Sequence, residues 1–477
     1  MEHIDRGPLG EHAVVLGASM GGLFAARVLA DRFRQVTVVE RDSLPDEPTS
    51  RKGAPQARHP HALLARGAQT LDELFPAILD DLVADGAPVW DDGDLSRTHI
   101  SFGGHLMPHS GMIDTDDLKT ARMYQPSRPL LEHHVRQRVH ALPNVTLLDN
   151  LAATQLIATA DRRRVTGVQL ADQAGGAGKT LTADLVVDAM GRGAHTPSFL
   201  ETLGYGRPIE QHIHMRTTYV SQKLKMRPGA LREMLVNISP EQGRPTGMFL
   251  VHNENNIWTF TVCGMTGLEP PHGLDSMLTF VERFAPPHML DAVRAAEPLG
   301  PVVGHRMPSS RWRRYDKMRR FPDGLVVTGD AVCSFNPIYG QGMSIAAADA
   351  LALRAELGAG LDGLPPRFFR TAAKSIAVAW QLGAGSDLAF PEVQGHRTPL
   401  TRLNNRFSDW LLSACESDRR VHAEFLRVAG LLDPPSRLFS PVLLGRMARA
   451  NLFHRRHPSR TFSDSHTTAH PPVTSAR

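Results

Sequence analysis

The sequence is poor in several features that would place a protein in a functional class. Its 477 residues include only three cysteines, Cys263, Cys333 and Cys415, whose spacing matches neither a disulfide framework nor a zinc site. Aromatic residues make up 6% of the chain and the formal net charge is +4, so we expect no nucleic-acid partner. The chain has no run of 18 uncharged apolar residues, and from its polar N-terminal stretch we expect no signal peptide. We therefore expect a cytoplasmic protein that does not span a membrane.

Several common catalytic and metal-binding motifs are also missing. The chain has no G-x-S-x-G nucleophile elbow, no G-x-x-x-x-G-K-[ST] phosphate loop and no W-x-W-x-I-P signature of flavin halogenases. The pairs His59/His61 and His212/His214 have no nearby cysteine and no carboxylate triad of ligand type, so no metal site is predicted. The glycine-rich stretch 174–180 lies between two strand-like segments, which favours a hairpin tip.

The end of the chain is basic and then of low complexity. The stretch "MARANLFHRRHPSR" at 447–460 indicates a solvated helix end or, alternatively, contact with an anionic or membrane surface. Residues 461–477 are rich in Ser, Thr, His and Pro, so a disordered tail is predicted there.

The segment from His12 to Asp42 has the pattern of a strand–helix–strand unit that binds a nucleotide. "AVVLG" and "QVTVVE" are short apolar strands, and the residues between them carry apolar side chains at helical spacing. Small residues in the turn before the helix let the backbone approach a pyrophosphate. Glu40 ends the second strand, where a carboxylate accepts ribose hydroxyls and disfavours a 2′-phosphate, so FAD or NAD is expected. The predicted binding residues of the turn are Gly17, Ala18, Ser19, Gly21 and Gly22.

Two further strand-end turns follow much later in the chain. Leu185–Val187 precedes "DAMGRG", and Leu325–Val327 precedes "TGDAVCSFNPIYGQGMS". Such turns can meet at the carboxyl edge of one parallel sheet although they lie far apart in the sequence. A helix with a simple N-cap after the last strand would explain neither Asp330 nor the paired glycines Gly340 and Gly342.

Together with "VVERD" and "SRPLLE", these turns resemble the FAD-dependent monooxygenases of the aromatic-hydroxylase and squalene-epoxidase type. The combination of "RKGAPQARHPHALL" with "FNPIYGQGMS" is similar to bacterial epoxidases of polyether-antibiotic biosynthesis and related natural-product tailoring enzymes. The resemblance covers most of the chain up to about residue 360. It implies FAD as cofactor, with Asp330 at the ribityl chain and with Gly340 and Gly342 beside the flavin. Further cofactor contacts that it implies are Arg41, Arg58, Arg128, Asp188, Gly191, Pro337 and Met343.

The expected fold is α/β, with a Rossmann-like FAD-binding domain, an inserted antiparallel-sheet substrate domain and a C-terminal helical region. Residues of alternating polarity between 207 and 305 indicate the antiparallel sheet. The expected boundaries are 1–206 for the first part of the FAD-binding domain with a substrate-side insertion near 90–120, 207–305 for the sheet, 306–360 for the second part and 361–460 for the helices. Candidate substrate residues on the sheet are Met215, Tyr219, Met248, Leu250, Trp258, Phe260 and Val262.

The resemblance implies insertion of one oxygen atom from O2 into a small apolar natural-product intermediate through a flavin C4a-hydroperoxide. Alkene epoxidation is the first expectation and hydroxylation the second, and no catalytic acid or base can be named. The chain has no second nucleotide-binding motif, so electrons are expected from NAD(P)H or from reduced flavin supplied by a partner flavin reductase. A flavin-dependent reductase of isoprenoid-type double bonds and a non-enzymatic flavoprotein are the alternatives.

Overall fold

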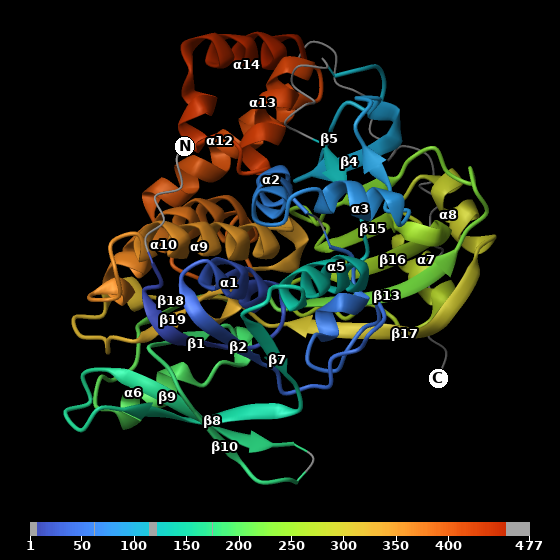
Figure 1. The fold of residues 1–477 in the computed structure, drawn as a ribbon. Helices are drawn as coiled ribbons and strands as arrows, with labels where there is room; N and C mark the ends of the chain where they lie inside the picture. Colours follow the sequence, from blue (N-terminus) through green and yellow to red (C-terminus); the bar gives the residue numbers. More distant parts are fainter. Residues whose placement is uncertain (1–6, 62, 114–121, 174, 455–477) are drawn as a thin grey trace, which may run out of the picture.

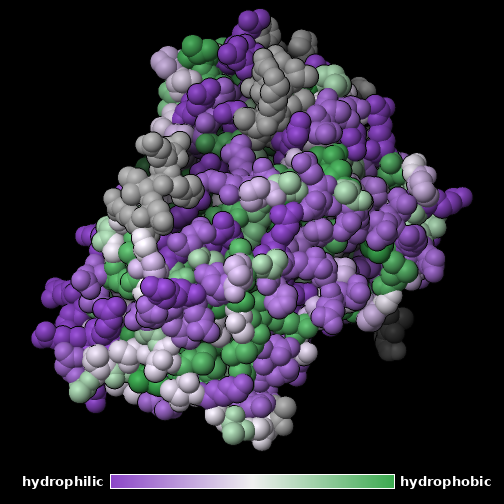
Figure 2. Space-filling view, in the orientation of Figure 1, coloured by the Kyte–Doolittle hydropathy of each residue, from purple (hydrophilic) through white to green (hydrophobic). Residues whose placement is uncertain are grey.

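The computed structural model describes residues 7–61, 63–113, 122–173 and 175–454 (Figure 1). The predicted tail at 461–477 lies outside these residues, as does the end of the basic stretch. In the described part of the chain, no helix is both long enough and apolar enough to cross a membrane. The face drawn in Figure 2 is mostly hydrophilic, with hydrophobic residues scattered among polar ones.

A five-stranded parallel sheet forms the centre of the nucleotide-binding part. Three of its strands contain short runs of valine and leucine that are buried on both faces, as is usual for a parallel sheet covered by helices. The strand order is β19-β11-β1-β2-β7, and every neighbouring pair is parallel. The strands are β1 (Gly10–Leu16), β2 (Phe33–Val39), β7 (Val145–Leu148), β11 (Leu185–Asp188) and β19 (Leu325–Val327).

Helices pack on this sheet because they are rich in small and apolar residues. Helix α1 buries eight of its residues, and α9 follows the third strand-end turn and packs beside α1 (Figure 1). The helices of this part are α1 (Met20–Ala30), α2 (Ala65–Leu74), α3 (Ile78–Ala84), α5 (Arg128–His140), α6 (Thr196–Thr202), α9 (Gly342–Leu357) and α10 (Leu364–Ala379).

A seven-stranded sheet forms the second part, to the right in Figure 1, in the order β17-β13-β16-β15-β14-β4-β5. One face packs on α7 (Leu274–Val281) and α8 (Pro287–Arg294) through a separate apolar core. All its strand pairs are antiparallel except β14 with β4, which is parallel, so the segment near residue 100 extends the sheet. The strands are β4 (Thr98–Phe102), β5 (His105–Leu106), β13 (Thr217–Lys225), β14 (Leu235–Ile238), β15 (Thr246–His252), β16 (Ile257–Gly264) and β17 (Glu297–Met307).

Helices α12 (Pro399–Cys415), α13 (Arg419–Ala429) and α14 (Pro441–His454) follow α10. They share an apolar core with Ile100 of β4 and with Met107, so they lie against the end of the seven-stranded sheet. A five-residue π-helical turn, Trp380–Ala384, and the short α11 (Gly385–Asp387) connect α10 to this layer. The expectation of a mostly helical C-terminal region agrees with this arrangement.

Three small sheets complete the fold. Strands β9 and β10 pair antiparallel on either side of the glycine-rich stretch, so the described part of that stretch belongs to a hairpin, as predicted. The small sheets contain β8 (Leu151–Ala158), β9 (Val165–Asp172) and β10 (Lys179–Thr182); β12 (Glu210–Ile213), β18 (Ser310–Arg313) and β20 (Cys333–Ser334); and β3 (Val89–Trp90) with β6 (Met123–Tyr124).

Candidate functional site

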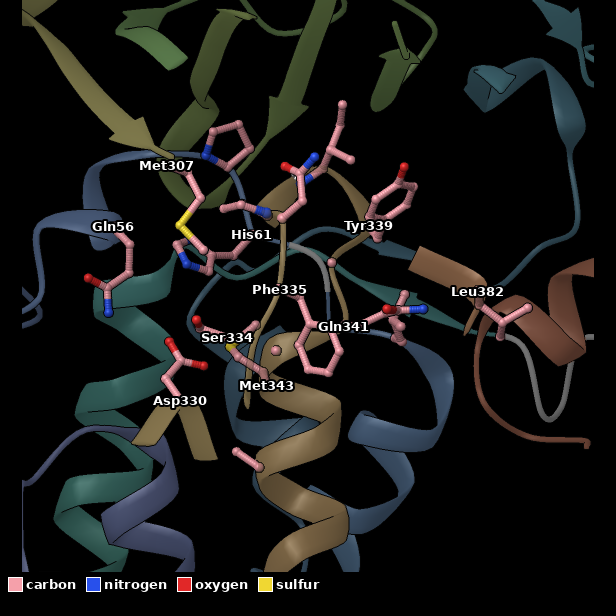
Figure 3. Close-up of a pocket in the computed structure, with 18 of the residues that line it drawn as sticks. Gln56, His61, Met307, Asp330, Ser334, Phe335, Tyr339, Gln341, Met343 and Leu382 are labelled. Atoms are coloured by element: carbon pink, nitrogen blue, oxygen red, sulfur yellow. Dashed lines mark hydrogen bonds between the residues drawn. The ribbon is translucent and has the colours of Figure 1, made fainter. Parts of the chain in front are cut away.

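One large cavity lies where the three layers meet, and its volume is about 1350 Å³. Its lining includes the carboxyl ends of the parallel strands, one face of the seven-stranded sheet and the C-terminal helices. Figure 3 shows part of this lining, with Asp330 and Met343 at one side and Leu382 at the other. The carboxyl edge of an α/β sheet is where such folds bind nucleotides, so the cavity is the candidate site.

The first strand-end turn requires glycine at two positions for steric reasons. Gly17 has a φ of +104°, and a Cβ atom there would lie 2.6 Å from the carbonyl oxygen of Ala189. A Cβ atom at Gly22 would lie 1.8 Å from the carbonyl oxygen of Gly17, so the first turn of α1 can pack closely only without a side chain. The Ala18 N–H donates to Oε2 of Glu40 at 2.8 Å, which ties the turn to the end of β2. The turn therefore brings the α1 N-terminus directly to the cavity.

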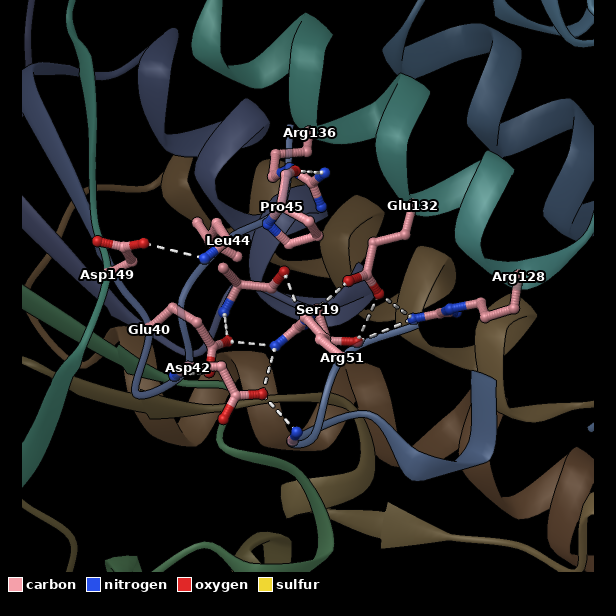
Figure 4. A network of polar contacts seen from close by, with 12 residues as sticks. Ser19, Glu40, Asp42, Leu44, Pro45, Arg51, Arg128, Glu132, Arg136 and Asp149 are labelled. Carbon is pink, nitrogen blue, oxygen red and sulfur yellow. Dashed lines mark hydrogen bonds and ion pairs between the residues drawn. The ribbon is translucent and has the colours of Figure 1, made fainter. Parts of the chain in front are cut away.

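A buried network of charges lies beside this turn (Figure 4). Arg51 donates from Nε to Glu132 at 2.8 Å, and its Nη1 lies 3.0 Å from Oε2 of Glu40. Arg128 donates to Glu132 and to the Ser19 hydroxyl, both at 2.8 Å, and that hydroxyl donates to Glu132 at 3.1 Å. Burial opposes ionisation of Glu132, but Arg128 and Arg51 hold the pKa of its carboxyl below the usual value.

Sequence reasoning found Glu40, Ser19 and Arg128 but missed Arg51 and Glu132. Arg51 lies in an irregular loop rich in Pro and Gly, where no periodicity shows which face its side chain occupies. Glu132 lies one helical turn after Arg128 on α5, and this i,i+4 spacing of opposite charges was the available signal.

Asp330, in the third strand-end turn, extends into the cavity. Its side chain has no hydrogen-bond or ion-pair partner among residues 7–61, 63–113, 122–173 and 175–454. Burial raises the pKa of its carboxyl, and the charges of Arg128, Arg192 and Arg311 partly oppose that rise. The carboxylate is exposed to the cavity, where a ligand can supply hydrogen-bond donors to it.

A second carboxylate, that of Asp349, holds the turn that carries Asp330 in position. Oδ2 of Asp349, on α9, accepts hydrogen bonds from the Gly329 N–H at 3.0 Å and from the Thr328 hydroxyl at 3.3 Å. Asp349 is completely buried, and burial raises its pKa to about 7. The sequence offered no sign of this role, because an aspartate inside an alanine-rich helix looks the same whichever face it occupies.

The loop between β20 and α9 is fixed by a buried polar cluster. The side-chain amide of Asn336 donates to Asp387 at 3.0 Å, and the Tyr339 hydroxyl donates to the same carboxylate at 2.8 Å. The Tyr219 hydroxyl on β13 donates to Oδ1 of Asn336. These contacts join the loop to the seven-stranded sheet and to α11. Gly340, with a φ of +65°, then turns the chain into α9.

Histidines line the cavity between this loop and the seven-stranded sheet. Nδ1 of His59 hydrogen-bonds with the Ser221 hydroxyl at 2.7 Å, and the His59 ring lies 5.7 Å from that of His305. Burial, with smaller contributions from His305 and Arg58, lowers the pKa of His59 to about 4, so it is neutral at neutral pH. Burial also lowers the pKa of His61, to about 3. In the part of the chain described here, no group of three or more ligand-type side chains is placed to hold a metal ion.

Most of the predicted cofactor residues come together around the cavity, although some do not face it. Asp188 is fully buried and accepts from the Met190 N–H at 2.8 Å and from the Thr196 hydroxyl, so it supports the second turn from inside. Arg58 is exposed and lies off the cavity, and Ala18 and Gly22 shape the first turn from behind. The predicted residues that line the cavity are Gly17, Ser19, Gly21, Glu40, Arg41, Arg128, Gly191, Asp330, Pro337, Gly340, Gly342 and Met343.

The predicted substrate residues are mostly on the other face of the sheet, which corrects that expectation. Tyr219 lines the cavity, whereas Met215 does not and is buried in the apolar cluster behind Tyr219 and Phe249. The others pack against α7 and α8; they are Met248, Leu250, Trp258, Phe260 and Val262. Side chains alternate along a strand, so the residues of opposite parity face the cavity, namely Phe249, Val251 and Thr261. Both faces of the sheet are covered by other parts of the protein. The polarity of a residue in the sequence therefore could not show whether its side chain faces the core or the cavity.

The residues around the cavity fit the predicted FAD. Asp330 offers an unpartnered carboxylate to ribityl hydroxyls, and Nε of Arg128 is buried without a partner among the described residues. The N-termini of α1 and α9 both face the cavity, and a helix N-terminus favours negative charge. A side chain at Gly17 would clash with the Ala189 backbone, so only glycine lets the turn keep its path beside the cavity.

Comparison with known proteins agrees with this geometry. Residues 11–367 match a family described as FAD binding domain. The chain is 36% identical over 451 residues to protein Rv3254 of Mycobacterium tuberculosis, which covers 93% of this chain and 94% of that protein. It is 29% identical over 364 residues to a kynurenine 3-monooxygenase of Salinispora tropica, with 72% of each chain covered.

Among solved structures, the flavin-dependent brominase Bmp2 has a similar fold. The TM-score is 0.63 at 13% identity, with 94% of this chain and 99% of that chain covered. At that identity the likeness shows the fold alone, because one fold hosts many chemistries. The predicted α/β fold and the predicted FAD cofactor are confirmed by these comparisons.

Proposed function

Since this chain belongs to the FAD binding domain family, we propose that it is a flavin-dependent monooxygenase that acts on a mostly apolar small molecule. The observation that carries the proposal is the continuity of the cavity. It runs as one continuous space from Asp330, at the nucleotide-binding edge, to the face of the seven-stranded sheet opposite α7 and α8. A monooxygenase needs such a space, because the substrate must lie beside the flavin while water is kept out.

The chain's own residues have distinct proposed roles. Asp330 accepts hydrogen bonds from the ribityl chain, and Asp349 holds the turn that carries it. Glu40 accepts from the adenosine ribose, and the α1 N-terminus and Arg128 bind the pyrophosphate. The backbone from Gly340 to Met343 lies along the flavin edge, and the α9 N-terminus stabilises negative charge there. Bound FAD, once reduced, supplies the electrons that activate O2.

The proposed reaction is transfer of one oxygen atom to an alkene, with ring hydroxylation as the second form. The support is the group of apolar side chains, Leu235, Phe249 and Val251, on the cavity face of the sheet, together with the likeness to polyether-type epoxidases. The neutral histidines His59 and His61 line the same space and bring no charge to it at neutral pH. Such a lining suits an apolar substrate.

The electrons for the flavin come either directly from NAD(P)H or from a partner flavin reductase. Anaerobic stopped-flow mixing of the purified holoenzyme with NADPH, and separately with NADH, distinguishes these routes. Fast bleaching of the flavin absorbance removes the need for a partner, whereas slow bleaching that a flavin reductase accelerates establishes one.

The reaction itself is tested with candidate substrates, a reductant and ¹⁸O₂, followed by mass analysis of the product. One labelled oxygen atom per product molecule supports a monooxygenase. A gain of two hydrogen atoms under anaerobic conditions, without oxygen incorporation, would overturn the proposal in favour of an alkene reductase.

A further inference from the structure

The cavity has an apolar end far from the nucleotide-binding turns, which we call the distal lobe. It lies between strands β4 and β14 on one side and helices α12 and α13 on the other. Its defining residues are Ile100, Phe102, Leu235, Leu411, Leu412 and Phe425. These side chains come from four separate elements and pack within one apolar cluster, so the lobe is a built part of the fold.

The distal lobe is continuous with the space beside the proposed flavin edge. The π-helical turn and α11 bridge the two regions, and their residues Leu382 and Ser386 line the cavity between them. In Figure 3 Leu382 lies on the side of the cavity where Gln341 points, at the edge of the α9 loop. Leu382 also packs against the apolar cluster behind the lobe. A ligand can therefore extend from the loop to α12 and α13.

Two carboxylates at the rim of this region already have protein partners. Glu241 binds Arg244 at 2.8 Å, and Asp409 binds His105 at 3.1 Å. Phe102 and Phe425 meet edge to face at 6.1 Å between ring centroids, which gives the lobe an apolar wall. The lobe thus offers apolar surface, and a short zwitterionic substrate would leave that surface uncovered.

The lining of the cavity also extends far beyond the nucleotide-binding turns. The 1350 Å³ cavity holds both cofactor and substrate, and its lining reaches from the Gly17 turn to Phe425 on α13. The space beyond the flavin edge is therefore elongated.

We propose that the substrate is an elongated, predominantly apolar molecule whose remote part lies in the distal lobe, with its reacting end at the 336–343 loop. This proposal rests on the proposed function for the identity of the site. It assigns the C-terminal helices a direct part in substrate selection, because α12 and α13 form one wall of the lobe.

The test measures binding of 4-alkylphenols with ethyl, butyl, hexyl and octyl chains to the FAD-loaded enzyme, by the change in flavin absorbance or by calorimetry. We expect each added methylene to tighten Kd by about threefold to fourfold, as burial of about 0.8 kcal/mol per CH2 predicts. A Kd that does not change with chain length would overturn the proposal.

A substitution in the distal lobe tests whether the effect of chain length on Kd arises in the lobe or from nonspecific hydrophobic binding elsewhere. In the Leu412→Trp variant the indole fills the lobe, so octylphenol should lose the gain in affinity while ethylphenol binds as before. The matched control is Leu403→Trp on the same helix, where the Leu403 side chain is 62% exposed. In this variant Kd should depend on alkyl chain length as it does in wild type. If Kd depends on chain length equally in wild type and in Leu412→Trp, the assignment of the distal lobe is overturned.

A second variant covers the case in which Leu412→Trp does not fold or retain FAD. Phe102→Ala enlarges the lobe and should weaken octylphenol binding about tenfold or more with little effect on ethylphenol. These measurements need no turnover, so their failure is distinct from failure of the proposed function. Binding that depends on chain length, without ¹⁸O incorporation, would reject the proposed monooxygenase function but retain the distal lobe as a binding site.

Discussion

The Arg51 guanidinium lies 3.0 Å from the Glu40 carboxylate, in an ion pair whose side chains are only 6% and 7% exposed. The pair joins the irregular loop after β2 to the end of that strand. Arg51 also binds Glu132 and lies 3.6 Å from Asp42, so one cation holds three carboxylates together at the cavity. Without it those carboxylates would repel one another in a region poorly screened by water.

Replacement of Arg51 should therefore be strongly destabilising. Removing one partner of a buried ion pair typically costs about 3–5 kcal/mol, so Arg51→Met should lower the free energy of unfolding by that order. Urea denaturation of the holoenzyme measures it. Arg34→Met is the control, because the Arg34–Glu11 pair is exposed on both sides and should change stability by less than about 1 kcal/mol. Similar values for both variants would contradict the buried role of Arg51.

Asp330→Asn should weaken FAD binding without destabilising the apoprotein. The carboxylate has no partner among the described residues, and a hydrogen bond to a charged group contributes about 1.5–3 kcal/mol, so Kd for FAD should rise about tenfold to a hundredfold. Fluorescence titration with FAD gives Kd, and thermal unfolding without FAD gives the apoprotein stability. A large drop in apoprotein Tm would mean that Asp330 supports the fold itself.

The two faces of the seven-stranded sheet should respond differently to substitution. Phe260→Ala, in the core under α7 and α8, should lower stability by about 3–5 kcal/mol and leave ligand affinity unchanged in the surviving folded protein. Phe249→Ala, on the cavity face, should weaken alkylphenol binding at a smaller cost in stability. Urea denaturation and ligand titration on both variants make the comparison. The reverse pattern would restore the assignment made from the sequence.

Asp387 should make stability depend on pH. Burial raises its pKa in the folded state to about 7, against an ordinary value of 3.8, and the hydrogen bonds from Tyr339 and Asn336 only partly oppose this. The folded state then holds a proton that the unfolded state has lost between about pH 4 and pH 7. Stability from this group is therefore present below pH 4 and is lost as pH rises through that window.

The Asp387→Asn variant isolates this effect, because it keeps an acceptor oxygen but does not titrate. Its stability relative to wild type should increase from pH 5 to pH 8, by up to about 3 kcal/mol. Urea denaturation at the two pH values measures the difference. A constant difference would show that the carboxyl keeps one protonation state throughout.

The nucleotide-binding turns were predictable because their requirements are local. Gly17 and Gly22 are needed where a Cβ would clash with backbone, and the strand–turn–helix pattern around them is contiguous in the sequence. Glu40, Asp330 and Gly340 follow or precede apolar strands and helices at recognisable spacings. The contacts of Arg51 and Asp387 were not predictable, since Arg51 lies in an irregular loop, Asp387 ends the short α11, and their partners are up to 81 residues away.

The assignment of substrate residues shows the limit of periodicity most clearly. Alternation along β15 and β16 correctly indicated strands, but it did not reveal which parity faces the cavity. Leu250 and Val251 are adjacent, both apolar and both buried, yet one packs under the helices and the other lines the cavity. Local pattern carries no information on that choice.

By itself, the sequence determined the α/β fold and the strand-end turns, because each depends on short segments with strict steric or hydrogen-bonding needs. The choice of FAD over NAD came from the resemblance of these segments to a known family. The tertiary structure alone decided which sheet face is the pocket, how Arg51 gathers three carboxylates, and that α12 and α13 form a wall of the distal lobe. These features depend on packing between elements distant in the chain. Burial energy depends on the neighbours that an apolar side chain meets, and only the folded chain specifies them.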